Sequence, residues 1–142
     1  DTLRCVHYRR EPGSPEPLPG QQRMGAHTDY GIVTVLWADR VPGLQLLAKS
    51  GEWVDVMPEP GAYLVNVGDL LAQWTNDRWV STLHRVVNHS GRERYSVPFF
   101  FTGNPDHEVA CLPGCVAPGE SPRFPTVTVE QHLRDCYRRT YG

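Results

Sequence analysis

Short runs of β-branched, aromatic and other apolar residues, separated by turn-forming residues, are the feature that most restricts how this chain can fold. Runs of this length and spacing are typical of the strands of a sandwich or barrel, and not of alternating βαβ units. The expected strands cover residues 2–9, 22–27, 31–37, 43–48, 52–56, 62–67, 83–88 and 94–103. The sequence therefore predicts a single all-β domain built from antiparallel sheets.

Loops and turns fill the spaces between these runs. Residues 10–25 are rich in Pro and Gly and predict a loop after the first strand. The segment KSGEW, residues 49–53, predicts a hairpin turn at Ser50 and Gly51, because glycine tolerates the positive φ that such turns require. Residues 110–127 contain too many Pro and Gly residues for regular structure.

Two helices are expected. A short one follows the turn at Gly68 and runs to about residue 75, with Asp69 as its N-cap. The second begins near Thr128 and includes VEQHLRDCYRR. Its apolar residues recur at helical spacing and are Val129, Leu133, Cys136 and Tyr137. The domain should thus carry an α-helix at its C-terminal end.

Length and charge restrict the partners. The 142 residues suit one domain, 1–142, and the net charge of −2 comes from interspersed charges. This distribution argues against nucleic-acid binding, and no apolar run approaches the roughly 20 residues of a membrane-spanning helix. We therefore expect a small-molecule partner, with neither nucleic acid nor membrane. The chain lacks an initiator Met and opens almost directly into a strand, which indicates a piece of a longer protein.

The four cysteines show no repeated CxxC spacing, which suits a reducing compartment, and we expect a cytoplasmic protein. A zinc site formed by Cys111, Cys115 and His107 is an alternative use of two of them. Pro113 and Gly114 between the two cysteines favour a plain turn instead, and no second ligand pair follows.

A histidine and an aspartate stand two residues apart in GAHTDYGIVTVLW, residues 25–37. Side chains at i and i+2 of a strand point to one face, so His27 and Asp29 would direct a nitrogen and an oxygen to a common point. His84, on another expected strand, completes two imidazoles and one carboxylate, the facial ligand set of non-haem Fe(II). An ordinary hydrogen-bonded pair and a half-buried histidine are the alternatives. His89 could compete as a ligand, but NHSG reads as an exposed turn.

Arg94 and Ser96 repeat the i, i+2 spacing on the last expected strand. A guanidinium fork beside a hydroxyl suits bidentate capture of a carboxylate, which a lysine would bind less well. The alternative is a solvated pair on a strand.

These motifs occur together in LRCVHY, GAHTDYGIVTVLW, PGLQLL, GEWVDV, YLVNVGDLLAQWTNDRWVSTLHRVV and ERYSVPFFF. In this order they resemble the catalytic core of the Fe(II)/2-oxoglutarate-dependent oxygenases, in the group of isopenicillin N synthase and the plant flavonoid and gibberellin oxygenases. The resemblance covers roughly residues 2–108. It implies a double-stranded β-helix, or jelly roll, with iron at one mouth.

On that resemblance His27, Asp29 and His84 take the iron positions and are the catalytic ligands. Arg94 and Ser96 take the positions that bind the distal carboxylate of 2-oxoglutarate, and Tyr8 falls where a tyrosine often reaches the same cosubstrate. Other residues in family-like segments read first as packing or orienting residues: Trp37, Asn66, Trp74, Trp79 and Arg85.

The reaction that the resemblance implies is oxidation of a small organic molecule by O2, with Fe(II) as the metal and 2-oxoglutarate as the cosubstrate. Hydroxylation and desaturation are both open. The alternatives are an oxidase of the isopenicillin N synthase kind, which does not use 2-oxoglutarate, and a non-catalytic cupin-like binding module. The family usually carries a helical N-terminal region that this chain lacks, so we expect an exposed apolar face bordering the first strand or the C-terminal helix.

Overall fold

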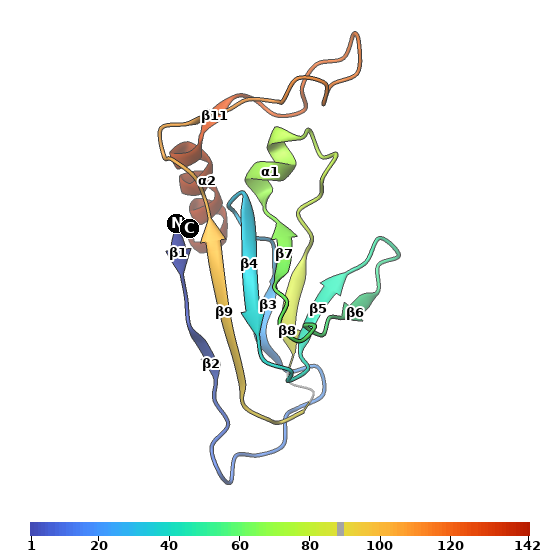
Figure 1. Ribbon diagram of the computed structural model, residues 1–142, viewed down its shortest axis with the longest axis vertical. Helices are drawn as coiled ribbons and strands as arrows, with labels where there is room; N and C mark the ends of the chain where they lie inside the picture. Colours follow the sequence, from blue (N-terminus) through green and yellow to red (C-terminus); the bar gives the residue numbers. More distant parts are fainter. Residues whose placement is uncertain (88–89) are drawn as a thin grey trace.

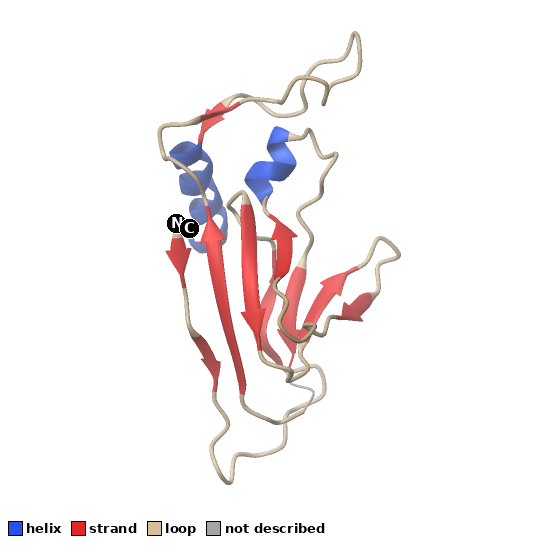
Figure 2. Ribbon diagram, viewed as in Figure 1, coloured by secondary structure: helices blue, strands red, loops and turns tan. Residues whose placement is uncertain are grey.

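The fold, seen in a computed structural model that describes residues 1–87 and 90–142, consists of two large antiparallel sheets, a two-stranded ribbon and two helices (Figures 1 and 2). The first sheet has the order β1-β9-β4-β7, with β2 also paired to β9. The second sheet has the order β3-β8-β5-β6 and lies behind and to the right of the first in Figure 1. A separate two-stranded ribbon joins β10 and β11.

The bounds of the strands agree with the sequence prediction to within two residues at most positions. The first sheet contains β1 (Thr2–Leu3), β2 (Val6–Tyr8), β4 (Val33–Ala38), β7 (Leu64–Val67) and β9 (Arg94–Phe101). The second contains β3 (Gln22–His27), β5 (Leu44–Leu47), β6 (Trp53–Asp55) and β8 (His84–Val87). The expected end of the strand 83–88, and His89, lie outside the described residues.

The connectivity confirms the jelly roll. When β1 and β2 are taken as one interrupted strand, the two sheets hold eight strands in chain order. Their spatial order is first–eighth–third–sixth in one sheet and second–seventh–fourth–fifth in the other. The interruption falls at Arg4 and Cys5, which the sequence prediction of one strand over 2–9 missed. The hairpin between β5 and β6 turns as predicted, with Gly51 at φ 87° and its N–H donating to the carbonyl of Ala48.

Helix α1 (Asp69–Trp74) begins differently from the prediction. Its N-cap is Gly68, which makes no side-chain cap, and Asp69 is already helical; the predicted Asp69 N-cap is wrong. The reason is a close approach of backbones, since a Cβ on Gly68 would lie 2.1 Å from the carbonyl oxygen of Gly31. Only glycine fits there. The Asp69 carboxylate instead accepts a hydrogen bond from the Thr28 hydroxyl.

Helix α2 (Val129–Tyr141) begins after Thr128, whose hydroxyl accepts a hydrogen bond from the N–H of Gln131. Val129 and Cys136 are buried as their spacing predicts, whereas Tyr137 is half exposed. A small core of Leu70, Val109 and Val129 joins both helices to β10 (Glu108–Val109), which pairs with β11 (Val127–Thr128). The sequence did not indicate this ribbon. Among the described residues, neither helix has the length and apolar character that crossing a bilayer requires.

The first sheet has an apolar face that the rest of the described chain leaves uncovered. Side chains in register across it, Leu3, Phe99, Val35 and Val65, belong to four different strands. Leu3 is 63% exposed and Val65 61%. We call this surface the outer apolar face; its large exposed members are Leu3, Trp37, Tyr63, Val65, Tyr95, Phe99 and Phe101. It borders the first strand, where an exposed face was expected.

Candidate metal and carboxylate site

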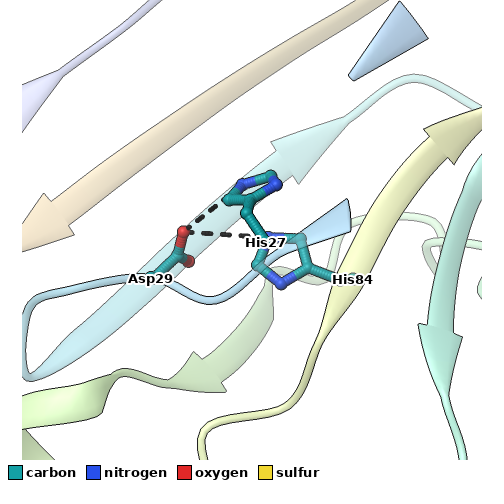
Figure 3. Close-up of side chains that lie close together, drawn as sticks. All are labelled: His27, Asp29 and His84. Carbon is teal, nitrogen blue, oxygen red and sulfur yellow. Dashed lines mark ion pairs between the residues drawn. The ribbon is translucent and has the colours of Figure 1, made fainter. Parts of the chain in front are cut away.

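Two histidines face each other across the second sheet. His27 is the last residue of β3 and His84 the first of β8, and the two are partners in the antiparallel register. Their rings are 4.3 Å apart between centroids. Asp29 points at both from the segment after β3, with Oδ1 3.8 Å from Nε2 of His27 and 3.7 Å from Nε2 of His84 (Figure 3).

The structure thus brings His27, Asp29 and His84 together, with ligand-type atoms all within 4.8 Å of one another. The prediction that His27 and Asp29 share one strand face is wrong in detail, because β3 ends at His27. Asp29 lies in the connection to β4, whose backbone is held by α1: the N–H of Asp69 donates to the carbonyl of Asp29 and that of Leu70 to Gly31. The side chain of Asp29 reaches the two histidines because of the path of this connection, and not because of strand alternation.

Backbone carbonyls fix the orientation of both imidazoles. Nδ1 of His27 lies 2.8 Å from the carbonyl oxygen of Gly25, and Nδ1 of His84 lies 3.1 Å from that of Thr82. Because a carbonyl only accepts, each Nδ1 donates the hydrogen bond, and Nε2 is the nitrogen that faces Asp29 and carries the lone pair in the neutral imidazole. This arrangement is typical of metal-ligating histidines, whose second nitrogen is held in the same way.

The Asp29 carboxylate is 6% exposed and uses its two oxygens differently. Oδ2 accepts hydrogen bonds from the Thr34 hydroxyl at 2.6 Å and from the Asn66 amide at 2.8 Å, while Oδ1 faces the histidines. Thr34 and Asn66 are partners in the register of β4 and β7. The carboxylate is therefore anchored to the first sheet and the imidazoles belong to the second, so the cluster joins both sheets.

Two imidazole nitrogens with free lone pairs and one carboxylate oxygen can hold a divalent transition metal on one side and leave its other positions open. One hydrogen bond to each imidazole and two to the Asp29 carboxylate keep the three side chains in place without a metal. Asn66 was expected to be a packing or orienting residue, and Thr34 was not among the predicted site residues. The only signal for Thr34 was its place on the buried face of a strand close after Asp29.

The expected carboxylate-binding residues lie on β9. Arg94 is 2% exposed, and its Nε has no hydrogen-bond partner among the described residues. Its guanidinium carbon lies 5.4 Å from the ring centroid of Tyr8, which pairs with Arg94 in register. Ser96, two residues on, is also buried. Register places Ser96 and Arg94 on the same face of the first sheet as Thr34, which binds Asp29.

Burial lowers the pKa of Arg94, and the nearby Tyr8 and Asp39 oppose that shift. No carboxylate among the described residues forms an ion pair with the guanidinium, although a buried cation is ordinarily paired. A buried arginine with an unpartnered Nε–H is suited to a ligand that brings its own carboxylate.

The remaining sequence candidates have structural roles. Arg85 donates to the Gln45 side chain and stacks over Trp53, 4.0 Å from its ring centroid. Trp74 packs against the small core, whereas Trp37 and Trp79 are exposed.

The alternative zinc site is not formed in the part of the chain that the structure describes. The backbone N–H of Cys115 closes the turn over Pro113 and Gly114, and His107 packs edge-on against Trp74. All four cysteines are free thiols.

Known proteins agree with this geometry. The profile of the 2OG-Fe(II) oxygenase superfamily matches residues 1–103. A 2-oxoglutarate-Fe(II) type oxidoreductase, hxnY, of Emericella nidulans is 52% identical over 99% of this chain and 40% of its own length. The sexual differentiation process protein isp7 of Schizosaccharomyces pombe is 41% identical over 99% of this chain and 34% of its own length.

Solved structures give the same result. Full-length Neurospora crassa T7H in complex with alpha-KG matches with a TM-score of 0.87 at 33% identity, over 98% of this chain and 44% of T7H. The rice dioxygenase for auxin oxidation matches with a TM-score of 0.83 at 31% identity, over 97% of this chain and 46% of that enzyme. The chain spans less than half the length of these relatives. The chain belongs to the 2OG-Fe(II) oxygenase superfamily.

Proposed function

We propose that residues 1–142 are the catalytic core of a longer oxygenase that uses Fe(II), O2 and 2-oxoglutarate to oxidise a small organic molecule. The observation that carries this proposal is the convergence of Nε2 of His27 and Nε2 of His84 on Oδ1 of Asp29, beside a buried arginine whose Nε has no hydrogen-bond partner among the described residues. The share of each relative that the chain spans supports a longer protein.

In this proposal His27, Asp29 and His84 hold Fe(II), which supplies the one-electron chemistry that lets O2 react with an organic molecule. The protein's own contribution is orientation. Gly25 and Thr82 carbonyls keep each Nδ1 protonated, so neither imidazole turns its N–H toward the metal. Thr34 and Asn66 donate hydrogen bonds to Oδ2, which stabilise its charge and leave Oδ1 for the ion.

Arg94 binds the carboxylate of 2-oxoglutarate that lies away from the metal, and Ser96 donates a hydroxyl to it. Tyr8 packs over the guanidinium and limits its motion. The overall change conserves atoms: 2-oxoglutarate and O2 yield succinate and CO2, and the second oxygen atom enters the substrate in a hydroxylation. The relatives solved with alpha-KG support this cosubstrate over the oxidase alternative.

A small organic substrate is supported by the relatives. Neurospora T7H has been solved with thymine and with 5-formyluracil, the rice enzyme is a dioxygenase for auxin oxidation, and a clavatol oxidase of Penicillium crustosum is 36% identical. We also propose a cytoplasmic location, which the four free thiols support because they suit a reducing compartment.

The experiment is an anaerobic titration of the full-length protein with Fe(II) and then 2-oxoglutarate, followed by the weak visible charge-transfer band of the chelate. We expect the band to form in the parent protein, to be lost in His84→Ala and to persist in the control His7→Ala, whose side chain pairs with Glu93 at the surface. Addition of O2 should release succinate. Iron binding without any band or succinate would favour the oxidase, and no iron binding would favour the cupin-like module.

A further inference from the structure

A second group of metal-ligand side chains lies between the two helices. Asp69 is the first residue of α1, and His132 and Cys136 stand four residues apart on α2. Their ligand-type atoms all lie within 4.8 Å of one another, and Sγ of Cys136 is 3.4 Å from Nε2 of His132. Residues at i and i+4 of a helix share a face, which is how helical ligand pairs bind one ion.

The surroundings of this cluster are those of a built site and not of an acidic surface. Cys136 is 1% exposed, and His132 and Asp69 are partly buried. Leu70 and Val129, two of the three buried residues of the small core, are the second residue of α1 and the first residue of α2. The cluster thus lies where α1 and α2 pack together, and none of its three residues belongs to the cluster of His27, Asp29 and His84.

We propose that Asp69, His132 and Cys136 form a second metal site, selective for Zn²⁺. A thiolate, an imidazole and a carboxylate are the three ligand types that Zn²⁺ accepts, and a mixed sulfur, nitrogen and oxygen set excludes Mg²⁺ and Ca²⁺. The site is distinct from the proposed iron site, whose ligands contain no sulfur and which suits Fe(II) better. This inference does not depend on the proposed oxygenase function.

Binding changes two existing contacts. Without metal, Nε2 of His132 donates to the carbonyl of Tyr30 at 3.1 Å, and the Arg139 guanidinium donates to Sγ of Cys136 at 3.0 Å. Zn²⁺ would replace both: the thiol releases its proton to solvent, and the proton on His132 moves by exchange with water from Nε2 to Nδ1. Arg139 is exposed and can turn into solvent.

Such a site would act as a brace between the helices. Tyr30 follows Asp29 directly, and α1 holds the same connection through the N–H groups of Asp69 and Leu70. An ion shared by α1 and α2 would fix the helix that supports the backbone of Asp29. We assign it a structural role because its ligands come from both helices; water would take the fourth position of a tetrahedral Zn²⁺.

Cobalt(II) is the probe, because thiolate-bound Co²⁺ has an intense near-ultraviolet charge-transfer band and Co²⁺ bound only by histidine and carboxylate has none. We expect metal-free full-length protein, titrated anaerobically with Co²⁺, to develop this band and to lose it when Zn²⁺ is added. The band should be absent in Cys136→Ser and in His132→Gln, and should persist in His84→Ala, which lacks a ligand of the other cluster.

Cys115→Ser is the matched control, since Cys115 lies in the turn after Pro113 and Gly114 and outside the cluster. Its Co²⁺ spectrum should equal that of the parent protein. Circular dichroism of the Cys136→Ser protein separates loss of the site from loss of the fold. A further variant, Asp69→Asn, keeps an acceptor for the Thr28 hydroxyl and should weaken Co²⁺ binding while the helices stay intact. Absence of the band in the parent, or a band that survives Cys136→Ser, would overturn the proposal.

Discussion

At the scale of single residues, Asp29 serves two purposes with one carboxylate. A buried carboxylate must be hydrogen-bonded to remain charged, and Thr34 and Asn66 meet that need through Oδ2 alone. Oδ1 then remains directed at His27 and His84. These hydrogen bonds hold the Asp29 carboxylate in place without an ion, so the residues that donate them should affect metal affinity.

We therefore predict that Asn66→Ala and Thr34→Val each weaken Fe(II) binding by roughly 10- to 100-fold, the usual effect of removing a group that orients a ligand. Anaerobic calorimetric titration of the full-length protein measures this. Thr2→Val, on exposed β1, is the control and should bind Fe(II) like the parent. Unchanged affinity in both site variants would mean that Oδ2 needs no anchor.

Arg94 permits a second test. A lysine at this position keeps the charge but loses the guanidinium fork, so Arg94→Lys should weaken 2-oxoglutarate binding by about 1.5–3 kcal/mol. Ser96→Ala should cost less, because it removes one neutral donor. Affinity is read from the charge-transfer band, and Arg9→Lys, at an exposed position where Arg9 pairs with Glu11, is the control. An unaltered affinity in Arg94→Lys would point to the oxidase instead.

At the scale of elements, sequence was informative wherever neighbours along the chain decide the structure. Strand alternation, the turn at Gly51 and the helix after Thr128 are local, and each is found where it was predicted. The cap of α1 was mispredicted because Gly31, which forces glycine at position 68, is 37 residues away. The β10–β11 ribbon pairs two-residue strands across a long loop and has no local signal.

The candidate site divides in the same way. The sequence predicted the ligand types from their spacing, and the structure brings His27, Asp29 and His84 together. The positions of Thr34 and Asn66 against Asp29 depend on the pairing of β4 with β7, which single-sequence patterns do not contain. The cluster of Asp69, His132 and Cys136 depends on how α1 packs against α2, which is still less local.

The start of α1 permits an element-scale prediction. A methyl group at position 68 would meet the backbone of Gly31, which cannot yield as a side chain can, so Gly68→Ala should lower the free energy of unfolding by at least 1–3 kcal/mol, a rough range for overpacking. It should also weaken Fe(II) binding, since the displaced backbone carries Asp29.

Gly51→Ala is the matched control. Nothing lies within 4 Å of its Cβ position, but its φ of 87° should cost about 1–2 kcal/mol. Urea denaturation and anaerobic Fe(II) titration separate the two variants, because the hairpin change should leave Fe(II) affinity unaltered. If the Gly68→Ala and Gly51→Ala variants bound Fe(II) with equal affinity, the contact between Gly68 and Gly31 would not position Asp29.

At the scale of the whole molecule, the outer apolar face gathers exposed apolar side chains from several strands of one sheet. Exposed apolar patches of this kind mark interaction sites or aggregation hazards. We predict that residues 1–142 expressed alone associate or aggregate and release little succinate even with iron bound, whereas the full-length protein is monodisperse and active. Light scattering and succinate release measure both properties. A monodisperse, fully active fragment would contradict this account.

A charge on that face should reverse the association. Val65→Lys places a cation at a position that is 61% exposed on β7 and should make the fragment more monodisperse in light scattering. Val54→Lys, at a similarly exposed position on β6 of the other sheet, should leave the association unchanged. The same effect from both variants would assign the association to general solubility and not to the outer apolar face.

Strand β9 presents Arg94 and Ser96 to the interior and Tyr95 and Phe99 to the outer apolar face. Alternation makes these two sets interdependent, because inserting or deleting one residue between them would exchange inside and outside for every position beyond the change. Over its length β9 can therefore vary in side chains but not in the number of its residues. Related chains should show substitutions in this strand freely on its outer positions, and gaps only in the connections at its ends.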